Sequence, residues 1–120
     1  GNSDMHCKNF SLIDTGNGDY VLSPAYDLLA VLLADPADTE EMAMSFSVGG
    51  KKGGFDHNTF MTAFVESGIS VSRSEKIIKQ MKTYLPKWKE LISQSFLPEN
   101  MKDDYYSLLE KRNRALDIII

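Results

Sequence analysis

Six residues, DTGNGD, separate two short runs of β-favouring side chains. The runs are FSLI at 10–13 and YVLS at 20–23, and the glycines and asparagine between them readily adopt positive φ angles. This pattern predicts a β-hairpin. With its turn centred between Gly16 and Asn17, Asn9 faces Pro24 across the hairpin. The residues that follow the hairpin are therefore expected to lie close to the residues that precede it.

Beyond the hairpin, most of the apolar pattern is helical. Apolar residues at 28–33 predict a short buried helix, and alternation at 43–48 predicts a strand that leads into a glycine-rich loop. Asp56 or Asn58 is expected to cap the next helix, which ends near Gly68.

The longest predicted helix begins at Ser72, which has capping-box spacing with Glu75. Pro86 is expected to kink or split it, and Pro98 to start a last helix. The side chains expected to face the core share a helical spacing: Ile77, Met81, Tyr84, Leu85, Trp88, Leu91, Ile92 and Phe96, then Met101, Tyr105, Leu108 and Leu109. The fold class that follows is α+β and mostly helical, in one domain that spans all 120 residues.

Charge and composition restrict the partners and the compartment. A net charge of −4 argues against a surface that binds nucleic acid directly. No apolar run approaches the roughly 20 residues that cross a membrane, and the N-terminus lacks a signal pattern. The single cysteine, Cys7, excludes an intramolecular disulfide and disfavours structural zinc, so a small buried side chain is expected there. We expect a cytoplasmic protein.

Three polar residues near the hairpin form a candidate site. Asp4 and Asn9 have the five-residue interval of the D-x-x-x-x-N catalytic loop in protein kinases, and the hairpin brings Asp27 close to Asn9. A carboxylate base, an amide oxygen and a second carboxylate are sufficient for magnesium-assisted phosphoryl transfer. The alternative at this point is that these residues merely cap loops, as Asp and Asn often do.

The same segments carry a family resemblance. GNSDMHCKNF followed by LSPAYDLL resembles the C-terminal domain of HipA-type serine/threonine kinases, the toxins of bacterial toxin–antitoxin pairs. That family has N-x-D-x-H-x-K-N-F before a hairpin and S-P-x-Y-D-L-L after it. SFSVGGK at 45–51 and the later helices also resemble the family's strand and helical lobe. The resemblance implies a kinase-like C-lobe: a short hairpin near the N-terminus followed by a helical bundle.

The resemblance assigns roles to individual residues. Asp4 takes the place of the catalytic base, while Asn9 and Asp27 take the places of the two magnesium ligands. His6 resembles a histidine that assists the base or the phosphate, and Lys8 is a candidate contact for a phosphate of ATP. The implied cofactors are Mg²⁺ and ATP, and the implied acceptor is a serine or threonine of a protein. Substrates in the family include aminoacyl-tRNA synthetases.

Other parts of a kinase are not found in this sequence. A glycine-rich phosphate loop and a lysine on a neighbouring strand normally precede the catalytic loop. We therefore expect a C-lobe without its N-lobe, inactive in isolation, with an antitoxin and a kinase N-lobe as partners. A non-catalytic module that binds an antitoxin or an N-lobe is the alternative, and a small-molecule kinase, suggested only by His6, is a weaker one.

Overall fold

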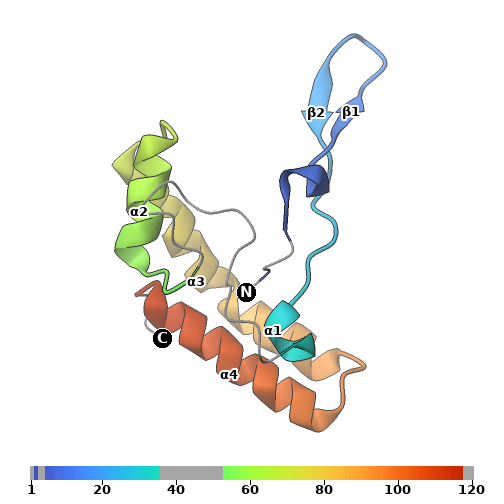
Figure 1. Ribbon diagram of the computed structural model, residues 1–120, viewed down its shortest axis with the longest axis vertical. Coiled ribbons are helices and arrows are strands. Elements are labelled where there is room, and N and C mark those ends of the chain that lie inside the picture. The colour runs from blue at the N-terminus through green and yellow to red at the C-terminus, as the bar shows by residue number, and fades with distance from the viewer. Residues whose placement is uncertain (1, 3–4, 36–52, 118–120) are drawn as a thin grey trace.

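The computed structural model describes residues 2, 5–35 and 53–117. Its elements, in chain order, are a 3₁₀ helix η1 (Cys7–Asn9), strands β1 (Leu12–Asp14) and β2 (Tyr20–Leu22), and helices α1 (Val31–Ala34), α2 (His57–Glu66), α3 (Val71–Gln94) and α4 (Glu99–Ala115). The hairpin extends away from the helices, and α4 lies along α3 (Figure 1). The predicted mostly helical α+β class is confirmed. The strand predicted at 43–48 lies outside the described residues.

The hairpin forms where the sequence predicts it, but its register differs by one residue. Leu12 pairs with Leu22 and Asp14 with Tyr20, whereas the predicted turn centre pairs Leu12 with Val21. The loop closes where Thr15 N donates to the backbone oxygen of Asp19, at 3.0 Å, so that its centre is Asn17. The turn therefore centres on a residue instead of between two residues, which moves each partner by one position.

Two glycines allow the backbone of the Thr15–Asp19 loop to turn. Gly16 and Gly18 have φ angles of 85° and 82°, in the region that side chains disfavour. Asp14 Oδ1 accepts a hydrogen bond of 2.8 Å from Gly16 N and so fixes the start of the loop. All strand residues are exposed, Leu12 and Tyr20 to more than 60%. The hairpin is thus a projecting arm and contributes nothing to the helical core.

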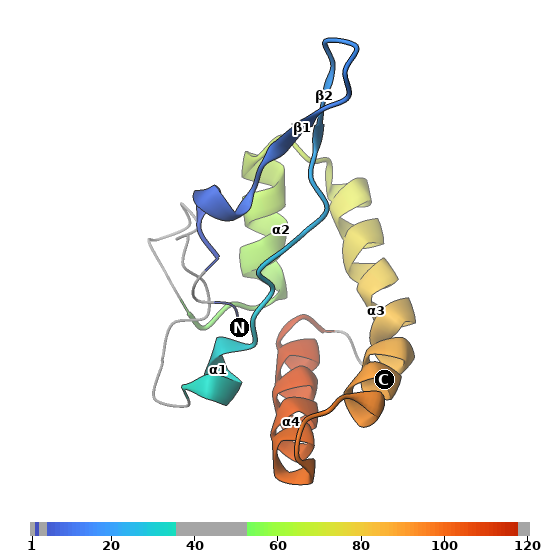
Figure 2. The same cartoon turned by 90° about the vertical axis from the view of Figure 1, so that its right-hand side faces the viewer.

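The helix predicted at 28–33 is shorter and less buried than expected. Only Val31–Ala34 is helical, and Leu28 and Leu29 are exposed. Residues 23–30 cross from the hairpin to α1 without regular secondary structure, and Figure 2 shows this segment running down from β2 to α1. Ala30, directly before α1, has φ −91° and ψ 74°, which lies outside the helical region, so the helix begins only at Val31.

Polar side chains start the two middle helices. Asp56 caps α2: its Oδ1 accepts from Thr59 N at 2.8 Å, as predicted, and Gly68 follows the helix end with a φ of 82°. For α3 the predicted cap at Ser72 is wrong. Ser70 is the N-cap and accepts from Arg73 N, so α3 begins at Val71.

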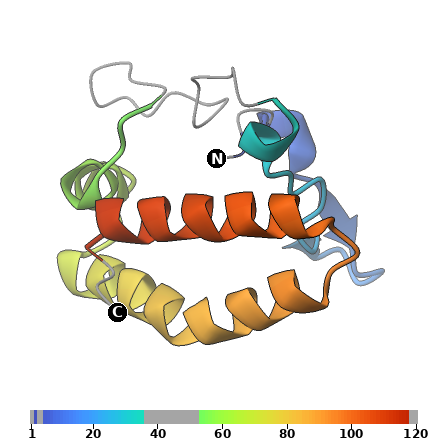
Figure 3. The same ribbon diagram turned by 90° about the horizontal axis from the view of Figure 1, so that it is seen from below.

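Pro86 lies inside α3 without ending it, so the predicted split is wrong. The ribbon of α3 is bowed in Figure 3, while α4 beside it is straight. A proline in a helix interior removes one backbone hydrogen bond and crowds the preceding turn, which is a sufficient cause for the bend. The single bent helix packs against both α2 and α4.

The core is small and lies where these helices meet. Its buried apolar side chains are Phe55, Ala63, Ile78, Leu85 and Ile92. The predicted stripe on α3 is therefore only partly right, because Ile78 is more buried than Ile77. Several other predicted members are exposed: Met81, Tyr84, Leu91 and Phe96. The predicted inner residues of α4 are half-buried. None of the described helices is long and apolar enough to span a membrane.

Candidate active site

Asn9 and Asp27 meet at the base of the hairpin. Asn9 ends η1 and is only 7% exposed, and its Nδ2 donates to Asp27 Oδ2 at 2.6 Å. A short bond from an amide to a carboxylate is a charge-assisted hydrogen bond, which is stronger than one between neutral groups. The structure therefore brings these two predicted site residues together, as the hairpin argument predicted, despite the different register.

The side-chain amide of Asn9 has a defined orientation. Its Oδ1 accepts from His6 N at 3.0 Å, while its Nδ2 faces the carboxylate. Since a backbone N–H only donates and a carboxylate only accepts, the opposite amide orientation loses both bonds. Asn9 N also donates to the backbone oxygen of His6, at 2.9 Å. These bonds fold residues 6–9 into a tight turn. The loop must turn back in this way if Asp4 and Asn9, five positions apart, are to face one site.

The backbone of Asp27 is held in an uncommon conformation. Its φ of 54° lies in the left-handed region, which Asp tolerates better than most residues other than glycine. Its backbone oxygen accepts from Asn2 Nδ2 at 3.2 Å. Asp27 is thus fixed through its main chain by Asn2 and through its side chain by Asn9. Such strained positions concentrate at functional sites.

The serine and tyrosine of the SPAYD segment tie the two sides of the site together. Ser23 N donates to the backbone oxygen of Ser11 at 2.8 Å, which continues the hairpin ladder past β1. Tyr26 OH donates to the backbone oxygen of Lys8 at 3.1 Å and accepts from Ser11 Oγ at 3.2 Å. The segment before Asp27 is therefore bonded directly to the loop that carries Asn9.

The other predicted site residues lie in or beside this loop. His6 and Lys8 flank Cys7, and all three side chains are exposed. The expectation that Cys7 is buried is wrong, because η1 is a single turn at the surface and buries only Asn9. Asp4, the predicted catalytic base, lies outside the described residues.

The donor chemistry of Asn9 and Asp27 fits a magnesium ion. Magnesium prefers hard oxygen ligands and is commonly held by one or two protein side chains together with phosphate oxygens and water. Asn9 Oδ1 keeps a second lone pair beyond the bond to His6 N. Among the described residues, Asp27 Oδ1 has no hydrogen-bond partner. Both oxygens therefore retain coordinating capacity.

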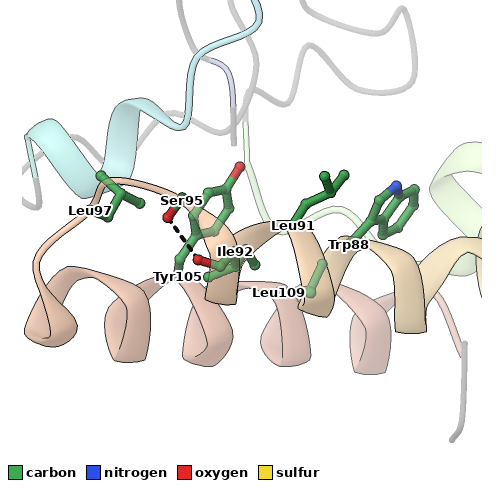
Figure 4. A pocket seen from close by; sticks show the side chains of 7 residues that line it. All are labelled: Trp88, Leu91, Ile92, Ser95, Leu97, Tyr105 and Leu109. Atoms are coloured by element: carbon green, nitrogen blue, oxygen red, sulfur yellow. Dashed lines mark hydrogen bonds between the residues drawn. The ribbon is translucent and has the colours of Figure 1, made fainter.

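A separate apolar pocket lies between α3 and the start of α4 and contains none of these residues. Its volume is about 390 Å³, and its lining residues are Trp88, Leu91, Ile92, Ser95, Leu97, Tyr105 and Leu109 (Figure 4). Nearby, Tyr106 OH donates to the backbone oxygen of Lys89 at 3.1 Å, which joins α4 to α3. Trp88 and Tyr106 are half-buried and serve packing here, which for Trp88 agrees with the predicted core-facing stripe.

Two residues of the site were not predicted. Asn2 is the first letter of the N-x-D-x-H-x-K-N-F pattern, and Tyr26 directly precedes Asp27. Their positions within the two motifs were the sequence signal that could have identified them as site residues. Their hydrogen bonds to Asp27 O and Lys8 O give each a physical role.

The comparison with protein families identifies the family of this chain. The model of the HipA-like C-terminal domain matches residues 1–88, which includes the whole site and most of α3. No curated protein gives a match to the chain. The chain therefore belongs to the HipA-like C-terminal domain family, a toxin-related and kinase-related family.

Proposed function

We propose that this chain is the C-lobe of a serine/threonine protein kinase that transfers a phosphoryl group from Mg-ATP to a cytoplasmic protein. The observation that supports this most directly is the bonded pair of Asn9 and Asp27, 2.6 Å apart. In this proposal both residues hold the magnesium ion, through Asn9 Oδ1 and the carboxylate of Asp27. The ion neutralises charge on the transferred phosphate when it is bound.

Asp4 is proposed as the base that accepts the proton of the acceptor hydroxyl. In sequence it stands midway between Asn2 and His6, and both of these residues bond to the pair: Asn2 to Asp27 O and His6 N to Asn9 Oδ1. His6 would assist Asp4 or the phosphate. Lys8, whose ammonium group is exposed, would contact a phosphate of ATP.

The partners in this proposal follow from the family. A kinase N-lobe would supply the glycine-rich loop and the nucleotide-binding lysine, and an antitoxin would restrain the kinase as the toxin of the pair. The exposed large apolar side chains near the hairpin support a protein neighbour at this end: Phe10, Leu12, Ile13, Tyr20, Val21, Leu22, Tyr26, Leu28 and Leu29.

The same exposed side chains favour a second candidate function. A non-catalytic module that binds an antitoxin or an N-lobe would also cover this surface, and it would not need Asp4. The two candidates therefore differ in what Asp4 does. A small-molecule kinase, suggested only by His6, is the weaker alternative.

The deciding experiment is transfer of labelled phosphate from ATP to protein by the full gene product that contains this chain. Asp4→Asn keeps the size of the side chain and removes the base, so we expect the rate to fall by about 10²- to 10⁴-fold. Asp103→Asn, on the exposed face of α4, is the matched control and should leave the rate unchanged. An unaltered rate in Asp4→Asn would sink the assignment of Asp4 as the base, whereas no transfer by the unaltered protein would leave the binding module.

A further inference from the structure

Tyr26 connects the two residues of the proposed metal site through bonds that the proposed chemistry does not use. Its hydroxyl donates to the backbone oxygen of Lys8 at 3.1 Å. That oxygen belongs to the peptide group whose nitrogen is Asn9 N. At its other end, Tyr26 shares a peptide bond with Asp27. One rigid phenol ring therefore spans from the peptide of Asn9 to the peptide of Asp27.

A second bond fixes the direction of the Tyr26 hydroxyl. Ser11 Oγ donates to Tyr26 OH at 3.2 Å and also lies 3.3 Å from Ser23 Oγ. Because a carbonyl oxygen only accepts, the phenol directs its own proton at Lys8 O and leaves its oxygen to accept from Ser11. The hydroxyl is thus held between Ser11 and Lys8, which lie on either side of Asn9 and Phe10 in the chain.

Asp27 itself is held by hydrogen bonds from Asn2 and Asn9. Asp27 is exposed and has a φ of 54°, and within residues 2, 5–35 and 53–117 the nearby strands pair only with each other. Tyr26 itself is 41% exposed, so its ring adds little to the core. A left-handed aspartate without core packing depends on local hydrogen bonds for its position.

We propose that Tyr26 is a positioning residue: its hydroxyl keeps the Asn9 loop and Asp27 at the separation that a divalent cation needs. This inference rests on the proposed function, in which Asn9 and Asp27 hold magnesium. Loss of the hydroxyl lets the Asn9 loop move relative to Asp27, so the pair opens more often. The affinity for the cation then falls, while the chemical step with the cation bound is retained.

Tyr26→Phe tests this directly, since it removes one oxygen and keeps the ring. Tyr20→Phe is the matched control, because Tyr20 is an exposed tyrosine of β2 on the same hairpin. In the ¹⁵N-labelled chain, we expect hydrogen exchange of the Asn9 side-chain amide to speed up roughly 2- to 10-fold in Tyr26→Phe, as loss of one hydrogen bond implies. Tyr20→Phe should exchange as the unaltered chain does.

A second measurement asks whether the cation site depends on the hydroxyl. Mn²⁺ broadening of the Asn9 and Asp27 signals gives an apparent dissociation constant, which we expect to rise by roughly 2- to 10-fold in Tyr26→Phe. In the full gene product, Tyr26→Phe should need a correspondingly higher magnesium concentration for half-maximal transfer. Its rate at saturating magnesium should approach the normal rate, whereas mere unfolding would lower that rate too.

The outcomes separate this inference from the proposed function. Unchanged Asn9 exchange in Tyr26→Phe overturns the positioning role, whatever the activity is. If Mn²⁺ leaves the unaltered chain's signals sharp, or the unaltered full gene product shows no transfer, the proposed function fails instead. The exchange measurement then still decides whether Tyr26 fixes the Asn9 loop, because it needs no metal.

Discussion

Asn9 Nδ2 lies 2.6 Å from Asp27 Oδ2, although 18 positions of sequence separate the two residues. The hairpin brings them together by returning the chain, and three further bonds hold them there: His6 N to Asn9 Oδ1, Asn2 Nδ2 to Asp27 O and Tyr26 OH to Lys8 O. The amide of Asn9 donates a hydrogen bond and the carboxylate of Asp27 accepts it, so the contact is favourable without a bound cation.

Asn9→Asp is expected to convert this attraction into repulsion. Two carboxylates at such a distance should lower the free energy of unfolding by about 1–3 kcal/mol at pH 7. The loss should shrink as the pH falls from 7 towards about 4, because the two carboxylates can then share one proton. Added Mg²⁺ should also reduce the loss. Urea unfolding over this pH range measures both effects.

The control for this change is Asn17→Asp, which adds the same charge at an exposed turn position. It should have a much smaller effect at pH 7 and no comparable response to Mg²⁺. Equal urea midpoints for the two variants at pH 7 would show that the contact between residues 9 and 27 does not matter for stability.

Leu85 is the most deeply buried apolar side chain in α3, with 3% of its surface exposed. Leu85→Ala should therefore lower the free energy of unfolding by about 2–5 kcal/mol through lost burial and a residual cavity. Leu91→Ala, on the same helix at 59% exposure, should change it by less than about 1 kcal/mol. Chemical unfolding followed by circular dichroism gives both values, and similar losses would contradict the observed orientation of α3.

Asp56 is expected to stabilise the start of α2. Its Oδ1 accepts from both Thr59 N, at 2.8 Å, and Thr59 Oγ1, at 2.7 Å. Asp56→Ala should cost about 1 kcal/mol, measured as a shift in the urea midpoint. Asn58→Ala changes the other residue that the sequence offered as a cap and should cost less. A larger loss of stability in Asn58→Ala than in Asp56→Ala would show that Asp56 is not the cap of α2.

Pro86 is expected to destabilise α3 relative to alanine. It is exposed inside the helix and supplies no backbone N–H, so Pro86→Ala should restore one hydrogen bond and relieve a steric clash. We expect the free energy of unfolding to rise by about 1–3 kcal/mol, detected as a higher thermal midpoint. A lower midpoint would mean that the bow in α3 is needed for its packing on α2 and α4.

Local rules explain what the sequence predicted correctly. The glycines between the two β-favouring runs select a turn, Asp56 caps α2, and Pro98 precedes α4, because each depends on neighbours within a few residues. The closeness of Asn9 and Asp27 also belongs here, since any hairpin in this segment returns the chain to Asn9. The two motifs that flank the hairpin carried the family resemblance, which the family match confirms.

Only the tertiary structure decided the rest. A turn centred on Asn17, and not between Gly16 and Asn17, shifted the hairpin register, and both registers satisfy a hairpin whose strands are exposed on each face. On α3, Ile77 and Ile78 are equally apolar, and in the helix as it packs against α2 and α4 Ile78 is the more deeply buried of the two. The Tyr26 hydroxyl meets Lys8 O because the folded hairpin places them together. These choices depend on packing between distant segments, and sequence periodicity contains no information on which partner will be present.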